Sequence, residues 1–132
     1  MRRLERILYV EDDHDVRDIG GIVLEIAGFD VRACASGAEA VALARTGNFA
    51  ADLVLLDVMM PGLDGPATLA QLRTIPAVTT LPVVFLTAKA YPREVEALRA
   101  LGAVGVLPKP FDPATLGEAL RRIYATTGGG GG

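Results

Sequence analysis

Four acidic side chains follow two short apolar runs, and their placement is the strongest chemical signal in the sequence. Glu11, Asp12 and Asp13 come directly after the run at residues 7–10, and Asp57 comes directly after the run at residues 53–56. Each run is too short for a helix and is apolar throughout, which is typical of a buried strand. Because open α/β sheets keep their sites at the carboxyl ends of their strands, we expect these acids to meet at one edge.

Such a group of carboxylates favours a divalent cation. Acids that lie close together repel one another unless a positive charge lies among them. Mg²⁺ prefers oxygen ligands and is usually held by one or two carboxylates together with waters and phosphate oxygens. A carboxylate can also accept a phosphoryl group and form an acyl phosphate. The pattern therefore predicts a divalent-metal site with Asp57 as its candidate nucleophile.

Strand-like and helix-like segments alternate five times along the chain. Strands are predicted at residues 7–10, 31–34, 52–57, 82–87 and 104–107. The first helix follows Asp13, its expected N-cap, and ends at Gly28. Its apolar side chains form one stripe at helical spacing: Val16, Ile19, Ile22, Val23 and Ile26. Inside this helix, Gly20 and Gly21 are expected to allow close packing against a neighbour.

Four further helices are predicted from their boundaries. Residues 36–39 (SGAE) form a capping box, and the helix that they open ends near Gly47. A third helix runs from Asp64 to a stop at Pro76, and a fourth runs from Pro92 to Gly102. Asp112 and Pro113 are expected to cap the last helix, which turns Leu116, Leu120 and Ile123 inward.

This alternation predicts the α/β class. Continuously apolar strands indicate a single doubly wound, five-stranded parallel sheet with helices on both faces. We expect the strand order 2-1-3-4-5, an order taken from known flavodoxin-like proteins rather than worked out from these residues. Residues 1–125 are predicted to be one domain, and residues 126–132 to be a flexible Gly-rich tail.

The composition excludes several classes of protein. The 132 residues are 51% hydrophobic and 22% charged, as expected for one soluble domain. The net charge of −3 and the lack of a basic block argue against direct binding of nucleic acid. The single cysteine, Cys34, is expected to be a buried core residue and fits a reducing compartment. No segment is typical of a signal peptide or membrane span, so we expect a cytoplasmic protein without a membrane partner.

In the predicted strand order, further functional groups reach the same edge of the sheet. Thr87 ends the fourth strand and Lys109 follows the fifth, beside the acids of the first and third. Four segments in this order resemble the receiver domain of two-component response regulators: residues 7–13 (ILYVEDD), 55–65 (LLDVMMPGLDG), 86–88 (LTA) and 109–111 (KPF). The resemblance covers residues 6–124 and implies the flavodoxin-like receiver fold.

The resemblance also implies the chemistry of the site. Asp57 would accept a phosphoryl group from a sensor histidine kinase or a histidine phosphotransfer protein in a Mg²⁺-dependent reaction. The metal ligands would be Asp12, Asp57 and the backbone carbonyl of Met59, with Glu11 acting through a metal-bound water. In this family, Met59 and the residue two positions after the threonine also tune how fast water removes the phosphoryl group, and Met59 favours slow loss.

Two further residues would couple the phosphoryl group to the rest of the domain. Lys109 would pair with the phosphoryl oxygens, and its bond to Pro110 is cis in the family. Thr87 would turn inward to bond the phosphoryl group. The resulting switch would control binding of a downstream protein on the face formed by the fourth helix, fifth strand and fifth helix. The domain would assist its own phosphorylation and dephosphorylation without being an enzyme in the usual sense.

One departure from the family concerns this switch. Val106 stands where the family usually has an aromatic residue that turns inward with the threonine. Our hypothesis is that Tyr91, four residues beyond Thr87, provides the aromatic signal instead. Residues 103–105 also lack the acids that many transcription-factor receivers use in ion pairs between subunits.

Two alternative functions remain open at this point. The first is a receiver-like interaction module that takes no phosphate, which Val106 keeps in consideration. The second is a Mg²⁺-dependent phosphatase with an Asp nucleophile, of the haloacid dehalogenase type. Such enzymes typically have a second acid two residues after the nucleophile. This chain has Met59 at that position, which argues against a phosphatase of this type. The sequence leaves open the cognate kinase, the target, the oligomeric state and whether the domain acts alone or within a longer protein.

Overall fold

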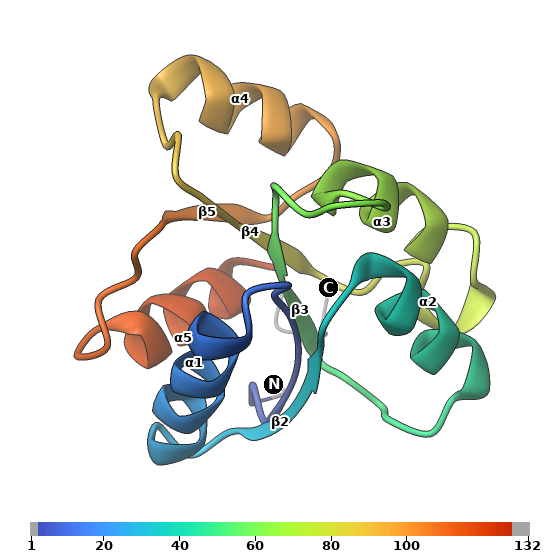
Figure 1. Cartoon of the computed structure of the whole chain (residues 1–132), viewed down its shortest axis with the longest axis horizontal. Helices are drawn as coiled ribbons and strands as arrows, with labels where there is room; N and C mark the ends of the chain where they lie inside the picture. Colours follow the sequence, from blue (N-terminus) through green and yellow to red (C-terminus); the bar gives the residue numbers. More distant parts are fainter. Residues whose placement is uncertain (1–2, 128–132) are drawn as a thin grey trace.

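Five short strands form one parallel sheet in the order β2-β1-β3-β4-β5 (Figure 1). The computed structural model describes residues 3–127. The strands are β1 (Arg6–Val10), β2 (Asp30–Cys34), β3 (Leu53–Asp57), β4 (Val83–Thr87) and β5 (Gly105–Pro108). The predicted α/β class and strand order are confirmed, and each predicted strand differs from the observed one by a single residue at one or both ends.

Helices cover both faces of this sheet. They are α1 (His14–Ile26), α2 (Gly37–Thr46), α3 (Gly65–Leu72), α4 (Pro92–Ala100) and α5 (Leu116–Thr126), with a short 3₁₀ helix, η1 (Pro76–Val78). Helices α1 and α5 lie on one face, and α2, α3 and α4 lie on the other (Figure 1). Every residue of β3 and β4 is therefore buried, because their alternating side chains supply two separate cores.

Three of the predicted helix starts are capped by their own side chains. Asp13 accepts hydrogen bonds from the backbone N–H groups of Asp15 and Val16, and Asp64 accepts one from Ala67. In the capping box, Ser36 accepts from the backbone of Glu39, whose carboxylate accepts in return from the N–H of residue 35. These bonds satisfy backbone donors that have no partner inside the helix.

Helices α1 and α4 end two residues before the predicted glycines, Gly28 and Gly102, and two further helix boundaries differ by more. Helix α3 ends at Leu72 and not at the proline, because Arg73 caps it and Pro76 instead begins the 3₁₀ helix η1. The prediction that Asp112 caps the last helix is wrong. Its carboxylate accepts from the N–H of Ala114 within a preceding turn, and α5 starts only after Thr115.

Helix α1 turns a different face inward than its apolar stripe indicates. Ile19, Ile22 and Ile26 are 57%, 56% and 82% exposed, whereas Gly20 and Leu24 are the buried residues. A Cβ atom at Gly20 would lie 2.3 Å from the hydroxyl of Tyr9, so the glycine makes room for the buried ring. Close packing is thus confirmed for Gly20 and is wrong for Gly21, where an added Cβ atom would meet nothing within 4 Å.

One buried acid has a structural role that the sequence did not predict. Asp52, just before β3, is 8% exposed, and its Oδ2 atom accepts hydrogen bonds from the backbone N–H groups of Glu5 (3.0 Å) and Arg6 (2.8 Å). It thereby joins the start of β3 to the start of β1. Within the described residues, none of the helices has the length and apolar character needed to span a membrane. The predicted tail at residues 126–132 overlaps the end of α5, and residues 128–132 lie outside the described part.

Candidate functional site

The groups predicted to act together lie at the carboxyl edge of the sheet. Glu11 follows β1, Asp57 ends β3, Thr87 ends β4 and Lys109 follows β5. Because β1, β3, β4 and β5 are neighbours and run parallel, their final residues lie side by side. Positions that are 98 residues apart in sequence are therefore brought into direct contact.

Three carboxylates at this edge form a group suited to a cation. Glu11, Asp12 and Asp57 each offer an oxygen, and these oxygens lie within 4.8 Å of one another. Glu11 and Asp57 are buried, whereas Asp12 is exposed and gives the group access to solvent. A set of oxygen donors that is partly open to water fits a hard divalent cation that keeps some of its waters. The residues present therefore fit a divalent metal.

The ammonium group of Lys109 lies between the two buried acids. Its Nζ atom is 2.9 Å from Oε1 of Glu11 and 3.0 Å from Oδ2 of Asp57. Burial alone would lower the pKa of Lys109, but the hydrogen bonds and charges of Glu11 and Asp57 outweigh it and raise that pKa. The ammonium is therefore held in its charged form, and it explains how two carboxylates can lie buried side by side.

Glu11 and Asp12, the two acids that directly follow β1, have different environments. Both oxygens of Glu11 are engaged, one by Lys109 and the other by the backbone N–H of Asp13 at 3.1 Å. Among residues 3–127, the carboxylate of Asp12 has no hydrogen bond or ion pair to another group. Asp12 is thus free to take a ligand directly, whereas Glu11 is held by the protein itself.

Thr87 is buried at this edge, but its hydroxyl faces its own loop. The Oγ1 atom accepts a hydrogen bond from the backbone N–H of Lys89 at 3.0 Å. The carbonyl of Thr87 accepts from the backbone N–H of Lys109 at 2.8 Å, which joins β4 to the residue that carries the ammonium. The peptide bond between Lys109 and Pro110 is cis, as the family resemblance implied.

The loop after Asp57 requires glycine at one point. A Cβ atom on Gly65 would lie 2.5 Å from the backbone oxygen of Asp57, so a side chain there would displace the candidate nucleophile. The backbone N–H of Gly65 also donates to the carbonyl of Val58 at 2.9 Å. The sequence predicted no role for Gly65, although its position eight residues after Asp57 in the matching segment was a signal. Met59, in the same loop, is 68% exposed, and the metal-binding role of its carbonyl stays a prediction.

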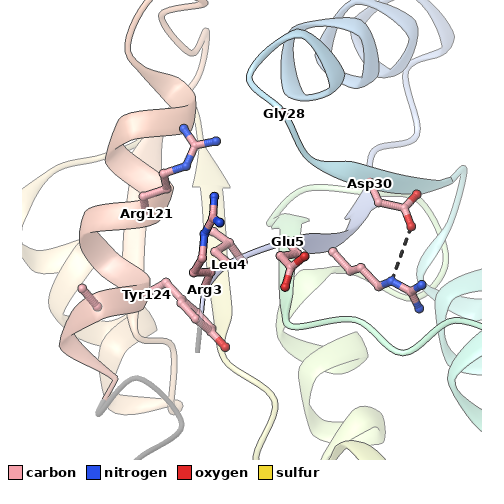
Figure 2. Close-up of a pocket in the computed structure, with 9 residues that line it drawn as sticks. Arg3, Leu4, Glu5, Gly28, Asp30, Arg121 and Tyr124 are labelled. Carbon is pink, nitrogen blue, oxygen red and sulfur yellow. Dashed lines mark ion pairs between the residues drawn. The ribbon is translucent and has the colours of Figure 1, made fainter. Parts of the chain in front are cut away.

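A separate hollow lies at the opposite, amino end of the sheet. Figure 2 shows its lining, which includes Arg3, Glu5, Asp30 and Arg121. The hollow has a volume of about 550 Å³. Arg121 stacks on the ring of Phe29, with its guanidinium 4.4 Å from the ring centre, and donates to a backbone carbonyl at the end of α1. Asp30 is paired with a neighbouring arginine at 3.5 Å. Arg121 and Asp30 are therefore already engaged by other groups of the protein, and the hollow is remote from the group of carboxylates at the carboxyl edge.

Comparison with known proteins decides the family. The sequence model of the response regulator receiver domain family matches residues 7–121 of the chain. The chain belongs to this family. The receiver domain is 37% identical over 122 residues to a transcriptional regulatory protein, a CpxR homolog of Haemophilus influenzae, and 36% identical over 126 residues to CseB of Streptomyces coelicolor. These matches cover 92% and 96% of the chain but 50% and 52% of the relatives, so the chain spans about half of their length.

Solved structures agree with this assignment. The chemotaxis protein CheY4 of Vibrio cholerae superimposes with a TM-score of 0.82 at 32% identity, covering 91% of this chain and 98% of that one. The receiver domain of a Francisella response regulator gives a TM-score of 0.81 at 28% identity. The chain is therefore a receiver domain of the response regulators that act in two-component signalling.

Proposed function

We propose that Asp57 accepts a phosphoryl group from a phosphohistidine of a sensor histidine kinase or a histidine phosphotransfer protein. The receiver domain would then act by binding a downstream protein in one state and not in the other. The observation that carries this proposal is the environment of Asp57. It is a buried carboxylate held by Lys109 at 3.0 Å and grouped with two further acids within 4.8 Å.

The transfer itself needs little covalent machinery from the protein. An Oδ atom of Asp57 forms the new bond to phosphorus as the bond from phosphorus to the histidine nitrogen breaks. The leaving nitrogen keeps the electron pair and takes a proton from water, so the donor returns to neutral histidine. Catalysis of such transfers rests on positioning and on neutralising charge. Lys109, already beside the carboxylate, supplies one positive charge for the phosphoryl oxygens.

Mg²⁺ is the cofactor that this group of oxygens fits. We assign its protein ligands as Asp12, Asp57 and the backbone carbonyl of Met59, with Glu11 acting through a water. When bound, the metal would neutralise charge on the phosphoryl oxygens and would help to orient the phosphoryl group for attack by Asp57. The free carboxylate of Asp12 and the engaged carboxylate of Glu11 support this division between direct and indirect ligands.

The response to phosphorylation would begin at Thr87. A phosphoryl group adds about −1.5 to −2 charges and strong acceptor oxygens. The Thr87 hydroxyl would leave the N–H of Lys89, its present partner at 3.0 Å, and donate to the phosphoryl group. Tyr91, the 68% exposed residue that precedes α4, would move with that loop in place of an aromatic side chain at Val106.

The partners proposed for this domain are proteins. The kinase or phosphotransfer protein would reach Asp57 at the carboxyl edge, and the downstream target would bind the face of α4, β5 and α5. We assign no contact with nucleic acid or membrane to the domain itself and place it in the cytoplasm. It would act by binding rather than by turning over a separate substrate.

The experiment is the intact mass of the protein after incubation with acetyl phosphate, with and without Mg²⁺. The wild type should gain one phosphoryl group only with metal, and Asp57→Asn should gain none. Asp64→Asn is the matched control, because it makes the same change at a helix cap seven residues away and asparagine is also a good N-cap. A wild type that gains no mass, also with a panel of phosphorylated histidine kinases, would leave the phosphate-independent interaction module as the function.

A further inference from the structure

A basic side chain on α1 contacts the turn that carries the metal-binding acids. Arg17 lies in the first turns of the helix, and its Nη1 atom donates to the backbone carbonyl of Glu11 at 2.9 Å and to that of Asp12 at 3.3 Å. These two residues supply two of the three grouped carboxylates. We propose that Arg17 is a positioning residue, which holds this turn in the geometry that binds the divalent cation.

The turn needs such support because its direct ligand is otherwise loosely held. The Asp12 carboxylate is exposed and unbonded within the described chain. On its C-terminal side, the backbone is fixed by Asp13, whose carboxylate caps α1 at 3.0 Å from two N–H groups. On its N-terminal side, the peptide between Glu11 and Asp12 is held by Arg17. Without the guanidinium, that peptide can rotate and carry the Asp12 side chain away from Asp57.

Arg17 acts through the backbone and not on the reacting atoms. Within the described residues it forms no ion pair with Asp57 or with another carboxylate, and its side-chain hydrogen bonds go to two backbone carbonyls. It therefore differs from Lys109, which contacts both buried acids directly. Partners of this kind, one step away from the ligands, typically affect metal affinity by about tenfold to a hundredfold.

The charge of Arg17 works in the opposite direction from its hydrogen bonds. A guanidinium near a cation site repels the cation, so loss of the charge alone would tighten metal binding. Loss of the two hydrogen bonds would loosen the turn and weaken metal binding. The sign of the change in affinity therefore separates a positioning role from a purely electrostatic one.

The test is the dissociation constant of Mg²⁺, measured by titration calorimetry without any phosphoryl donor. We expect Arg17→Ala to raise it about tenfold and Arg17→Lys, which keeps the charge and one donor group, to raise it less. Arg122→Ala is the matched control, since it removes the same charge from an exposed ion pair on α5 with a 75% exposed side chain, and it should leave the constant unchanged. An unchanged or smaller constant in Arg17→Ala, or an equal change in Arg122→Ala, overturns the proposal.

Two further measurements separate this outcome from general damage. Urea unfolding of Arg17→Ala without Mg²⁺ should resemble that of the wild type, because the bonds hold only one surface turn. If Arg17→Ala does not fold, Arg17→Gln takes its place, and a wild-type dissociation constant in that variant refutes the positioning role. The role of Arg17 rests on the proposed Mg²⁺ site, but its failure can be distinguished from a failure of the proposed phosphoryl transfer. A wild type that binds Mg²⁺ but takes no phosphoryl group removes the proposed function and leaves the role of Arg17 intact.

Discussion

Lys109→Ala tests the electrostatic balance of the site. The side chain is 23% exposed and is the cation that separates Glu11 and Asp57, whose side chains are 0% and 3% exposed. Its removal leaves two buried carboxylates facing each other with no positive partner. Breaking a buried pair in this way typically costs 3–5 kcal/mol. We expect about 3 kcal/mol, the lower end, because the opening beside the exposed Asp12 lets water reach the acids.

The assay is urea unfolding followed by circular dichroism, with and without Mg²⁺. With a slope of about 2 kcal/mol per molar urea, a loss of about 3 kcal/mol lowers the midpoint by about 1.5 M. Mg²⁺ should restore more stability to the variant than it adds to the wild type, because the metal replaces the lost cation and no ammonium competes with it. A ligand at a hundred times its dissociation constant adds about 2.7 kcal/mol. Lys89→Ala is the matched control, since Lys89 is exposed and is the other lysine of the chain.

The pH dependence of the wild type has a definite sign. The pKa of Lys109 is raised in the folded protein, because the partners Glu11 and Asp57 outweigh burial. Its contribution to stability is therefore complete below the ordinary lysine pKa and is lost only as the pH rises through the higher folded value.

A Lys109→Ala variant whose free energy of unfolding lies within about 0.5 kcal/mol of the wild-type value without Mg²⁺, or one that Mg²⁺ does not preferentially stabilise, would refute this explanation of the site.

Two further predictions concern the cores beside the site. Gly20→Ala should destabilise the protein by about 1–2 kcal/mol in urea unfolding, since the new methyl group meets the buried ring of Tyr9, whereas Gly21→Ala should stabilise it by up to about 1 kcal/mol in open space. Equal stability of the two variants would contradict the packing of α1. The Cys34 thiol should react with a thiol reagent at pH 8 only after unfolding, because burial raises its pKa to about 11 and leaves roughly one molecule in a thousand as thiolate. Rapid reaction of the folded protein would contradict that burial.

The sequence was sufficient for the sheet and for the residues at its edge. The apolar run before Glu11 ends with β1, and the run before Asp57 ends one residue before the end of β3. A parallel sheet covered on both faces demands continuous apolar side chains and tolerates acids only at its rim. The cap residues Asp13 and Asp64 could also be predicted from the sequence, since capping depends on hydrogen bonds to residues two or three positions away.

Other features could not be predicted from the sequence, because they depend on contacts between segments that are distant in the chain. The role of Asp52 comes from backbone groups 46 and 47 residues away, which no local pattern encodes. The inward face of α1 is set by the ring of Tyr9, which requires Gly20 there and leaves Ile19, Ile22 and Ile26 exposed. Arg17 falls on a helix surface where a solvated charge is the ordinary interpretation, and only the turn of the backbone reveals its two carbonyl partners.

The most direct test of the account locates the phosphoryl group within the chain. After incubation with acetyl phosphate and Mg²⁺, sodium borohydride would reduce the acyl phosphate to an alcohol, and peptide mass spectrometry would identify the reduced residue. We predict reduction at Asp57 alone, because it is the carboxylate that is both buried at the end of β3 and paired with Lys109. Reduction at Asp12 or Asp13, or uptake of a phosphoryl group without any reduced carboxyl group, would contradict the assignment of Asp57 as the acceptor.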